Sequence, residues 1–293
     1  MNKILYSYIP YIDEDVFYNL LKKTDNLEYS KSGSNSKCAI IDNFAVLKTG
    51  NIPSHDNSFP KMINCLHNLK KENVNVVQIL GYAVTRLGDT FDDGARYDKG
   101  YIVQEKAKGS ELLCPSEFMG KSEQECYDIV IRYLKTLDNI PQQHFDKWVA
   151  DYKIITDNMV LIDPSKESNF FYDDKNGFSF IDLNFFSKQR LFDKTNSDGT
   201  LHHDLFIDYT FLPFWALAFG RYDKYFKTSK DVEFAQKVMR GGYDKMVNAL
   251  LKIGVTLEDI EYCLEKGGMR NSRMSSFKTE HNVKKDFTDD LTI

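Results

Sequence analysis

Residues 160–183 read VLIDPSKESNFFYDDKNGFSFIDL, a stretch in which short apolar runs alternate with polar segments. Its apolar runs predict three short strands, at residues 159–162, 169–172 and 178–183. The Asp-Asp-Lys-Asn-Gly sequence at 173–177 predicts a turn between the second and third strands. The polar residues between the first two strands therefore lie in a loop, and Asp182 lies at the end of the third strand.

Four polar side chains in this stretch have the types that phosphoryl transfer requires: Asp163, Lys166, Asn169 and Asp182. A carboxylate can orient or deprotonate an acceptor hydroxyl, and a cation can stabilise the charge on the transferring group. Amide and carboxylate oxygens can hold Mg²⁺. The order of these residues indicates a phosphotransferase site, whereas a plain hairpin with solvated charges is the simpler alternative.

The same stretch resembles the catalytic and metal-binding loops of the protein kinase-like superfamily, whose patterns are H-R-D-L-x-x-x-N and D-F-G. The resemblance implies that Asp163 and Lys166 are catalytic, that Asn169 and Asp182 hold Mg²⁺, and that ATP is the phosphoryl donor. Asp163 and Asn169 are six residues apart, one more than in the family pattern, and Pro164 occupies the expected position of the Asp. No His-Arg precedes Asp163, and the D-F-G triplet is Asp-Leu-Asn.

A second part of the resemblance lies in YSKSGSNSKCAIIDNFAVLK, residues 29–48, which predicts a strand, a Gly/Ser turn, a strand, a turn and a strand that ends at Lys48. This segment resembles the nucleotide-binding sheet of kinases, which implies that Lys48 contacts the α- and β-phosphates. Gly33 and Ser34 lie in the turn, where backbone N–H groups can approach phosphate closely. The compact spacing is similar to that of aminoglycoside-phosphotransferase-like kinases. An ordinary hairpin with an edge lysine is the alternative.

A helix is predicted over residues 59–71, where Met62, Ile63, Leu66 and Leu69 follow helical spacing. In the family a Glu on the corresponding helix pairs with the strand lysine. This helix has no Glu until Glu72 at its end, and Asp56 precedes it, so the acidic partner of Lys48 stays unassigned.

The run YIVQEKAKGSEL, residues 101–112, resembles the hinge between the two lobes of a kinase. The resemblance implies that backbone groups of Glu105 and Ala107 contact the adenine edge and that Gly109 is the pivot. An edge strand followed by a charged loop explains the same residues. Beyond it, apolar periodicity predicts helices over 122–139 and from Pro141 onwards.

Composition indicates a folded chain. Of its 293 residues, 42% are hydrophobic and 28% are charged, which is enough to form a large core and two lobes. The formal net charge of −5 argues against a general nucleic-acid binder. Five scattered cysteines suggest a reducing compartment, and no signal peptide or membrane span is predicted. We expect a cytoplasmic protein, with secretion without a cleavable signal peptide left open.

Together these features predict an α+β protein with a two-lobed kinase-like fold. The predicted boundaries are a small β-rich N-lobe with one helix at 1–107, a mostly helical C-lobe at 108–266 and a polar tail at 267–293. The predicted partners are ATP, Mg²⁺ and a hydroxyl acceptor on a protein or small molecule. Two alternatives remain: a pseudokinase that binds nucleotide or protein without catalysis, and an unrelated α+β interaction protein.

Overall fold

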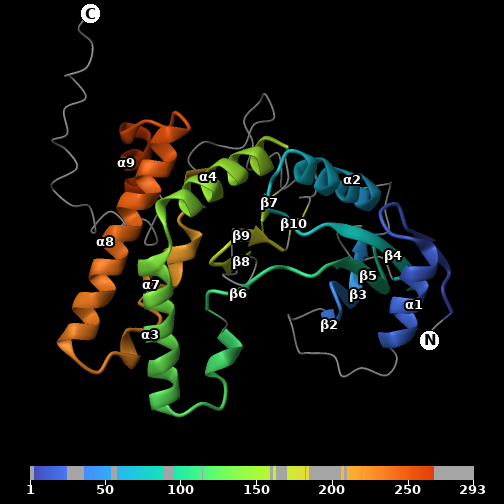
Figure 1. Cartoon of the computed structure of the whole chain (residues 1–293), viewed down its shortest axis with the longest axis horizontal. Coiled ribbons are helices and arrows are strands. Elements are labelled where there is room, and N and C mark those ends of the chain that lie inside the picture. Colours follow the sequence, from blue (N-terminus) through green and yellow to red (C-terminus); the bar gives the residue numbers. More distant parts are fainter. Residues whose placement is uncertain are drawn as a thin grey trace, which may run out of the picture. The chain divides into compact units, whose positions relative to one another are not determined.

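The computed structural model describes residues 3–24, 36–53, 58–88, 96–113, 115–158, 161–162, 170–181, 183–184, 206–207, 210–218 and 220–266. The chain divides into two compact units. Figure 1 shows the helices and strands, coloured along the sequence. The first unit comprises residues 1–110 together with 160–162 and 169–186, and the second comprises the remainder. The stretch quoted above is therefore divided between the two units.

A five-stranded antiparallel sheet forms the centre of the first unit, in the order β1-β4-β5-β3-β2. Its strands are β1 (Tyr6–Tyr8), β2 (Ser36–Ile41), β3 (Phe44–Pro53), β4 (Ile79–Arg86) and β5 (Tyr97–Glu105). The tight β2–β3 turn places Asp42 at a positive φ of 54°, a conformation that Asp adopts more readily than most residues. β3 continues beyond Lys48, where the sequence predicted that it would end.

Two helices pack on the sheet, α1 (Glu14–Thr24) and α2 (Ser58–Lys71). Phe17 of α1 forms a buried cluster with Ala83 of β4, whereas Phe59 of α2 packs edge to face against Tyr82, with the ring centroids 4.8 Å apart. Because successive strand residues point to opposite faces, the two helices cover opposite faces of the sheet. The sequence predicted α2 but not α1, so the expectation of a single helix here was wrong.

The first unit also contains a hairpin formed by β8 (Phe170–Asp173) and β9 (Gly177–Phe180). The Asp173 carboxylate accepts hydrogen bonds from the side chain and backbone of Asn176, which lower the pKa of Asp173. The predicted hairpin and turn are confirmed, but the third predicted strand is interrupted. β9 ends at Phe180, and a separate β10 (Leu183–Asn184) pairs with β7 (Leu161–Ile162).

The second unit is mostly helical. Its helices are α3 (Glu123–Asn139), α4 (Gln142–Asp157), α7 (Trp215–Ala218), α8 (Ser229–Lys252) and α9 (Leu257–Lys266), with short 3-10 helices at Pro115–Phe118, Leu212–Phe214 and Asp223–Tyr225. A two-residue strand, β6 (Ser110–Glu111), spans the boundary between the units. Ser122 caps α3 and Thr228 caps α8, each through a reciprocal capping box.

Large aromatic side chains form the core of the second unit. Phe145, Trp148 and Tyr152 of α4 are almost completely buried. The Trp148 indole Nε1–H donates to the Thr210 carbonyl at 2.9 Å, so the buried polar group has an acceptor. On α8, a Cβ at Gly242 would lie 2.2 Å from the Phe214 ring, so the helix approaches this core too closely for any side chain at that position.

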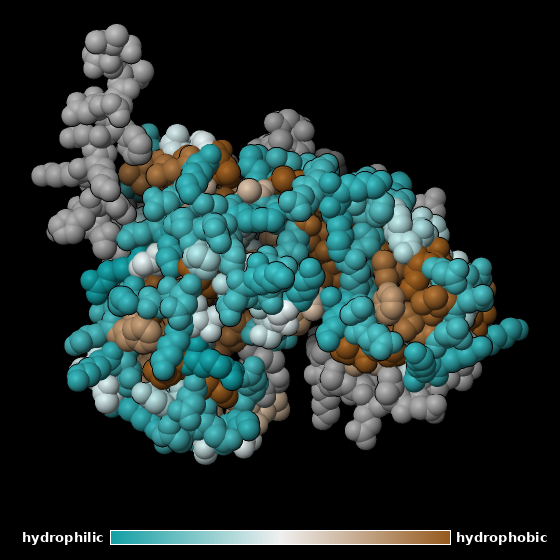
Figure 2. All heavy atoms as spheres, viewed as in Figure 1, coloured by the Kyte–Doolittle hydropathy of each residue, from teal (hydrophilic) through white to brown (hydrophobic). Residues whose placement is uncertain are grey.

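The predicted fold class is confirmed: a β-rich N-terminal unit is followed by a mostly helical one. The two helices predicted at 122–139 and from Pro141 correspond to α3 and α4. Hydrophilic residues cover most of the surface visible in Figure 2, with hydrophobic residues showing in patches between them. None of the helices within the described ranges has the length and apolar character needed to span a membrane.

Candidate functional site

The structure describes only some of the residues that the sequence predicted for the site. Lys48, Glu105 and Ala107 lie within the described residues. The other six, Asp163, Lys166, Asn169, Asp182, Gly33 and Ser34, lie outside them, as does the tail at 267–293. Their roles stay predictions, and the elements that flank them define the candidate site.

The β7–β10 ladder joins the two parts of the predicted catalytic segment. Ile162 pairs with Leu183, and Leu161 pairs with Asn184, in an antiparallel register. In this register the two strands run in opposite directions, so the end of β7 lies opposite the start of β10. Ile162 and Leu183 therefore form the end of the ladder that is nearer in the sequence to Asp163 and Asp182.

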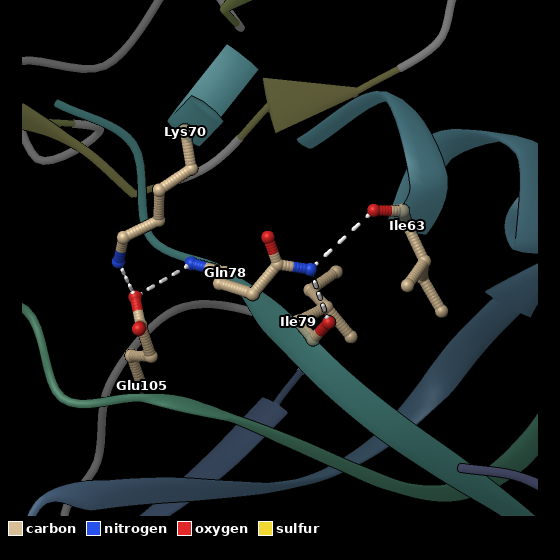
Figure 3. Close-up of polar contacts among 5 residues, drawn as sticks. All are labelled: Ile63, Lys70, Gln78, Ile79 and Glu105. Atoms are coloured by element: carbon tan, nitrogen blue, oxygen red, sulfur yellow. Dashed lines mark hydrogen bonds and ion pairs between the residues drawn. The ribbon is translucent and has the colours of Figure 1, made fainter. Parts of the chain in front are cut away.

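Glu105, at the end of β5, lies in a polar cluster that also includes Lys70 of α2 and Gln78 (Figure 3). The carboxylate forms an ion pair with the Lys70 ammonium and accepts a hydrogen bond from the Gln78 backbone N–H at 3.2 Å. In return, the Glu105 N–H donates to the Gln78 carbonyl at 2.9 Å. The side chain and the backbone of Glu105 are thus both held by Gln78.

The Gln78 side chain is buried and is directed towards α2. Its Nε2 donates to the Ile79 carbonyl at 2.8 Å and to the Ile63 carbonyl at 3.4 Å, as Figure 3 shows. Its Oε1 is buried and has no hydrogen-bond partner within the described part of the chain. One side chain therefore ties α2 to the start of β4.

The segment that precedes β4 also holds the end of β9. The Val77 N–H donates to the Phe180 carbonyl, and the Phe180 N–H donates to the Asn75 carbonyl, each at 2.9 Å. The Asn75 Nδ2 adds a bond to the Phe178 carbonyl at 2.5 Å. Residues 75–78 thus connect β9, which leads towards Asp182, with Glu105. β4 begins only at Ile79, because the backbone of 75–77 pairs with β9 instead.

Two backbone donors at residues 105–106, within the run 101–112 that was predicted to be a hinge, are already used within the first unit. The Glu105 N–H is bonded to Gln78, and the Lys106 N–H donates to the Asn43 carbonyl at 2.8 Å. The Ala107 N–H donates to no backbone carbonyl within the described ranges. Gly109 has a φ of 81°, and a Cβ there would lie 2.1 Å from the Tyr172 carbonyl oxygen of β8. Only glycine fits at this position.

Lys48 lies on the face of the sheet that α1 covers. It is paired with Tyr101 of β5, and its Nζ lies 6.0 Å from the centroid of that ring. Tyr101 belongs to the buried cluster around Phe17 of α1. Lys48 itself is exposed, and Glu72, one of its possible partners, is an exposed residue just beyond the end of α2. Asp56, the other, lies outside the described residues.

Sequence reasoning missed Lys70 and Gln78. A lysine in the last turn of a helix is common because it complements the helix dipole, so Lys70 carried no distinct signal. Its partner, Glu105, is 35 residues away in the chain.

Within the described ranges, no group of three or more His, Cys, Asp or Glu residues could hold a metal ion.

The first unit contains a strand hairpin that carries Lys48, then α2, then β4 and β5, which precede the helical unit in the chain. The sequence predicted strands, a helix and further strands in this order, followed by a helical part. No family model and no curated protein matches the chain. Among solved structures, Rad53 residues 1–466 in complex with AMP-PNP has 13% identity and a TM-score of 0.39. The match covers 89% of this chain and 66% of that one, just under two thirds of its length. The aminoglycoside phosphotransferase APH(3'')-Id from Streptomyces rimosus ATCC10970 has 10% identity, a TM-score of 0.35 and coverage of 90% and 99%, respectively.

Proposed function

We propose that the chain is an ATP- and Mg²⁺-dependent phosphotransferase that acts on a hydroxyl group of a protein or a small molecule. The observation that supports this most strongly is the pairing of Ile162 with Leu183. Asp163 directly follows Ile162, and Asp182 directly precedes Leu183. Both aspartates are therefore sequence neighbours of the same strand pair.

Two carboxylates linked in this way can divide the work of phosphoryl transfer. Asp163 orients or deprotonates the acceptor hydroxyl, and Lys166 stabilises the charge on the transferring group. Asn169 and Asp182 supply oxygen ligands for Mg²⁺. When bound, the metal ion neutralises charge on the phosphate oxygens.

The hinge and the strand hairpin hold the nucleotide in this proposal. Ala107 offers its backbone N–H to the adenine edge, while Glu105 can offer only its carbonyl because its own N–H is bonded to Gln78. Gly33 and Ser34 approach the phosphates through their backbone N–H groups. Lys48 contacts the α- and β-phosphates.

The direct test is transfer of the γ-phosphoryl group from labelled ATP to water, to the protein itself and to panels of hydroxyl acceptors. We expect slow, Mg²⁺-dependent release of phosphate or autophosphorylation by the wild-type chain. A wild type that binds Mg-ATP but transfers nothing under any of these conditions would refute catalysis. A wild type that binds no nucleotide would refute the proposal as a whole.

The placement of Lys48 favours a second candidate, a pseudokinase that binds nucleotide without catalysis. Lys48 is on the α1 face, whereas α2 packs on the other face and has no acidic residue in its sequence. The ion pair that activates kinases, between a helix Glu and the strand Lys, therefore has no counterpart on α2. Binding of Mg-ATP without turnover distinguishes this candidate from the first.

A further inference from the structure

We propose that Lys70 is a positioning residue that couples α2 to the hinge through Glu105. The inference rests on the proposed function, because the hinge is taken as the adenine-binding segment. In the kinase pattern, the helix provides the acid and a strand provides the lysine. Here the charges are reversed: α2 provides Lys70, and the acid is Glu105 on β5.

The hydrogen bonds around Glu105 explain how a side-chain contact fixes the backbone. Its carboxylate accepts from the Gln78 N–H, and its own N–H donates to the Gln78 carbonyl. The two bonds close a ring between the residues, so a displaced carboxylate loses its hydrogen bond to the strand backbone. Lys70 is the cation that holds this carboxylate from α2 (Figure 3).

The position of Gln78 extends the coupling to β9. The same segment bonds to Phe180 through Val77 and to α2 through the Gln78 side chain. A displacement of α2 therefore acts on the hinge and on the strand that leads to Asp182 together. The position of α2 sets the geometry of the nucleotide site through this segment, with no direct ion pair to Lys48.

Four single variants and one double variant, Lys70→Met/Glu105→Gln, test the role of Lys70. Lys70→Met removes the charge and keeps the aliphatic stem, and Lys70→Arg restores a cation. Lys71→Met is the matched control, because Lys71 is an exposed neighbour on the same helix end. Glu105→Gln keeps an oxygen acceptor for the Gln78 N–H but removes the charge. Each variant is measured for Mg-ATP affinity by calorimetry, for melting temperature, and for amide hydrogen exchange over residues 74–80 and 104–108.

Partly exposed ion pairs are weak, so we expect Lys70→Met to lower Mg-ATP affinity about two- to fivefold. Exchange in both segments should accelerate without nucleotide, while the melting temperature holds. Lys70→Arg should recover the wild-type values, and Lys71→Met should match the wild type. The Lys70→Met/Glu105→Gln double variant should lose no more Mg-ATP affinity than the more strongly affected single variant. The reason is that both substitutions remove the same ion pair.

Unchanged exchange in Lys70→Met, an equal effect of Lys71→Met, or additive losses in the double variant would each overturn the inference. The exchange measurement needs no nucleotide. If the wild type fails to bind ATP while the exchange follows the expected pattern, the proposed function fails, and the coupling of α2 to residues 104–108 stands as a structural one.

Discussion

Ile162 pairs directly with Leu183 across the β7–β10 ladder. This pair joins two segments that are 21 residues apart in the chain and that lead to Asp163 and Asp182. In the proposed function, this pairing brings together the two segments that carry the acceptor-binding and metal-binding carboxylates. The predictions below test the roles of individual residues around it.

The first prediction concerns Asp182. Replacing it with Ala removes a charged metal ligand, so the gain in ATP affinity on adding Mg²⁺ should largely disappear. Calorimetric titrations with and without Mg²⁺ measure this gain. Asp174→Ala, in the exposed turn of the neighbouring hairpin, is the control and should keep the full gain. If Mg²⁺ raises the ATP affinity of Asp182→Ala as much as that of the wild type, Asp182 is not a metal ligand.

The second prediction concerns Lys48. Because Lys48 is exposed and keeps its aliphatic stem in Lys48→Met, the melting temperature should hold while Mg-ATP affinity or turnover falls. Lys37→Met is the matched control, since Lys37 is the exposed cross-strand neighbour of Lys48 on β2. If Lys48→Met unfolds the protein or binds ATP normally, Lys48 is a structural edge lysine.

The third prediction concerns Gly109. A methyl group at this position would lie 2.1 Å from the Tyr172 carbonyl oxygen, and the positive φ adds backbone strain. Gly109→Ala should therefore destabilise the fold by about 2–4 kcal/mol. Gly120 also has a positive φ, of 73°, but a methyl group at Gly120 would meet no described atom within 4 Å. Gly120→Ala should therefore cost only the backbone strain, about 1–2 kcal/mol. Denaturant unfolding measures both, and equal losses would show that the contact with β8 does not matter.

The fourth prediction concerns pH. Hydrogen bonds from the Ser122 backbone, with those from the Lys121 and Ser122 side chains, lower the pKa of Glu125 to about 2 from an ordinary 4.5. A carboxyl whose folded pKa is depressed stabilises the fold fully above the unfolded pKa and loses that contribution as the pH falls to the folded pKa. Stability should therefore fall between pH 4.5 and about 2, and less steeply in Glu125→Gln. Melting temperatures across this range measure the slope; parallel curves for the two proteins would contradict the assignment.

Local patterns were enough to predict the regular elements. The α3 and α4 helices follow apolar periodicity, and the turn between β8 and β9 follows the Asp-Asp-Lys-Asn-Gly sequence. The sequence before α1 also carries an ordinary helix-start signal. Asp13 lies just before the helix, and its carboxylate accepts a hydrogen bond from the Asp15 N–H. The apolar pattern of α1 is too short to predict the helix by itself.

Long-range pairing accounts for what the sequence could not predict. β7 and β10 have two residues each, too few to show a period, so their ladder arises from tertiary contact. Residues 74–78 alternate like a strand, yet their hydrogen bonds go to β9 and Glu105. The Lys70–Glu105 ion pair joins the end of a helix to the end of a strand. The sequence around either residue does not indicate that the two residues pair.

The most direct test of the central proposal is phosphoryl transfer by wild type and Asp163→Asn, with Mg-ATP affinity measured on the same samples. Loss of a general base commonly costs 10²–10⁴-fold in rate, so we expect the Asp163→Asn rate to fall by at least about 100-fold. Affinity should stay within about twofold, because the residue that orients the acceptor is not a primary metal ligand. Equal transfer rates in the two proteins would contradict the assignment of Asp163 as the catalytic residue.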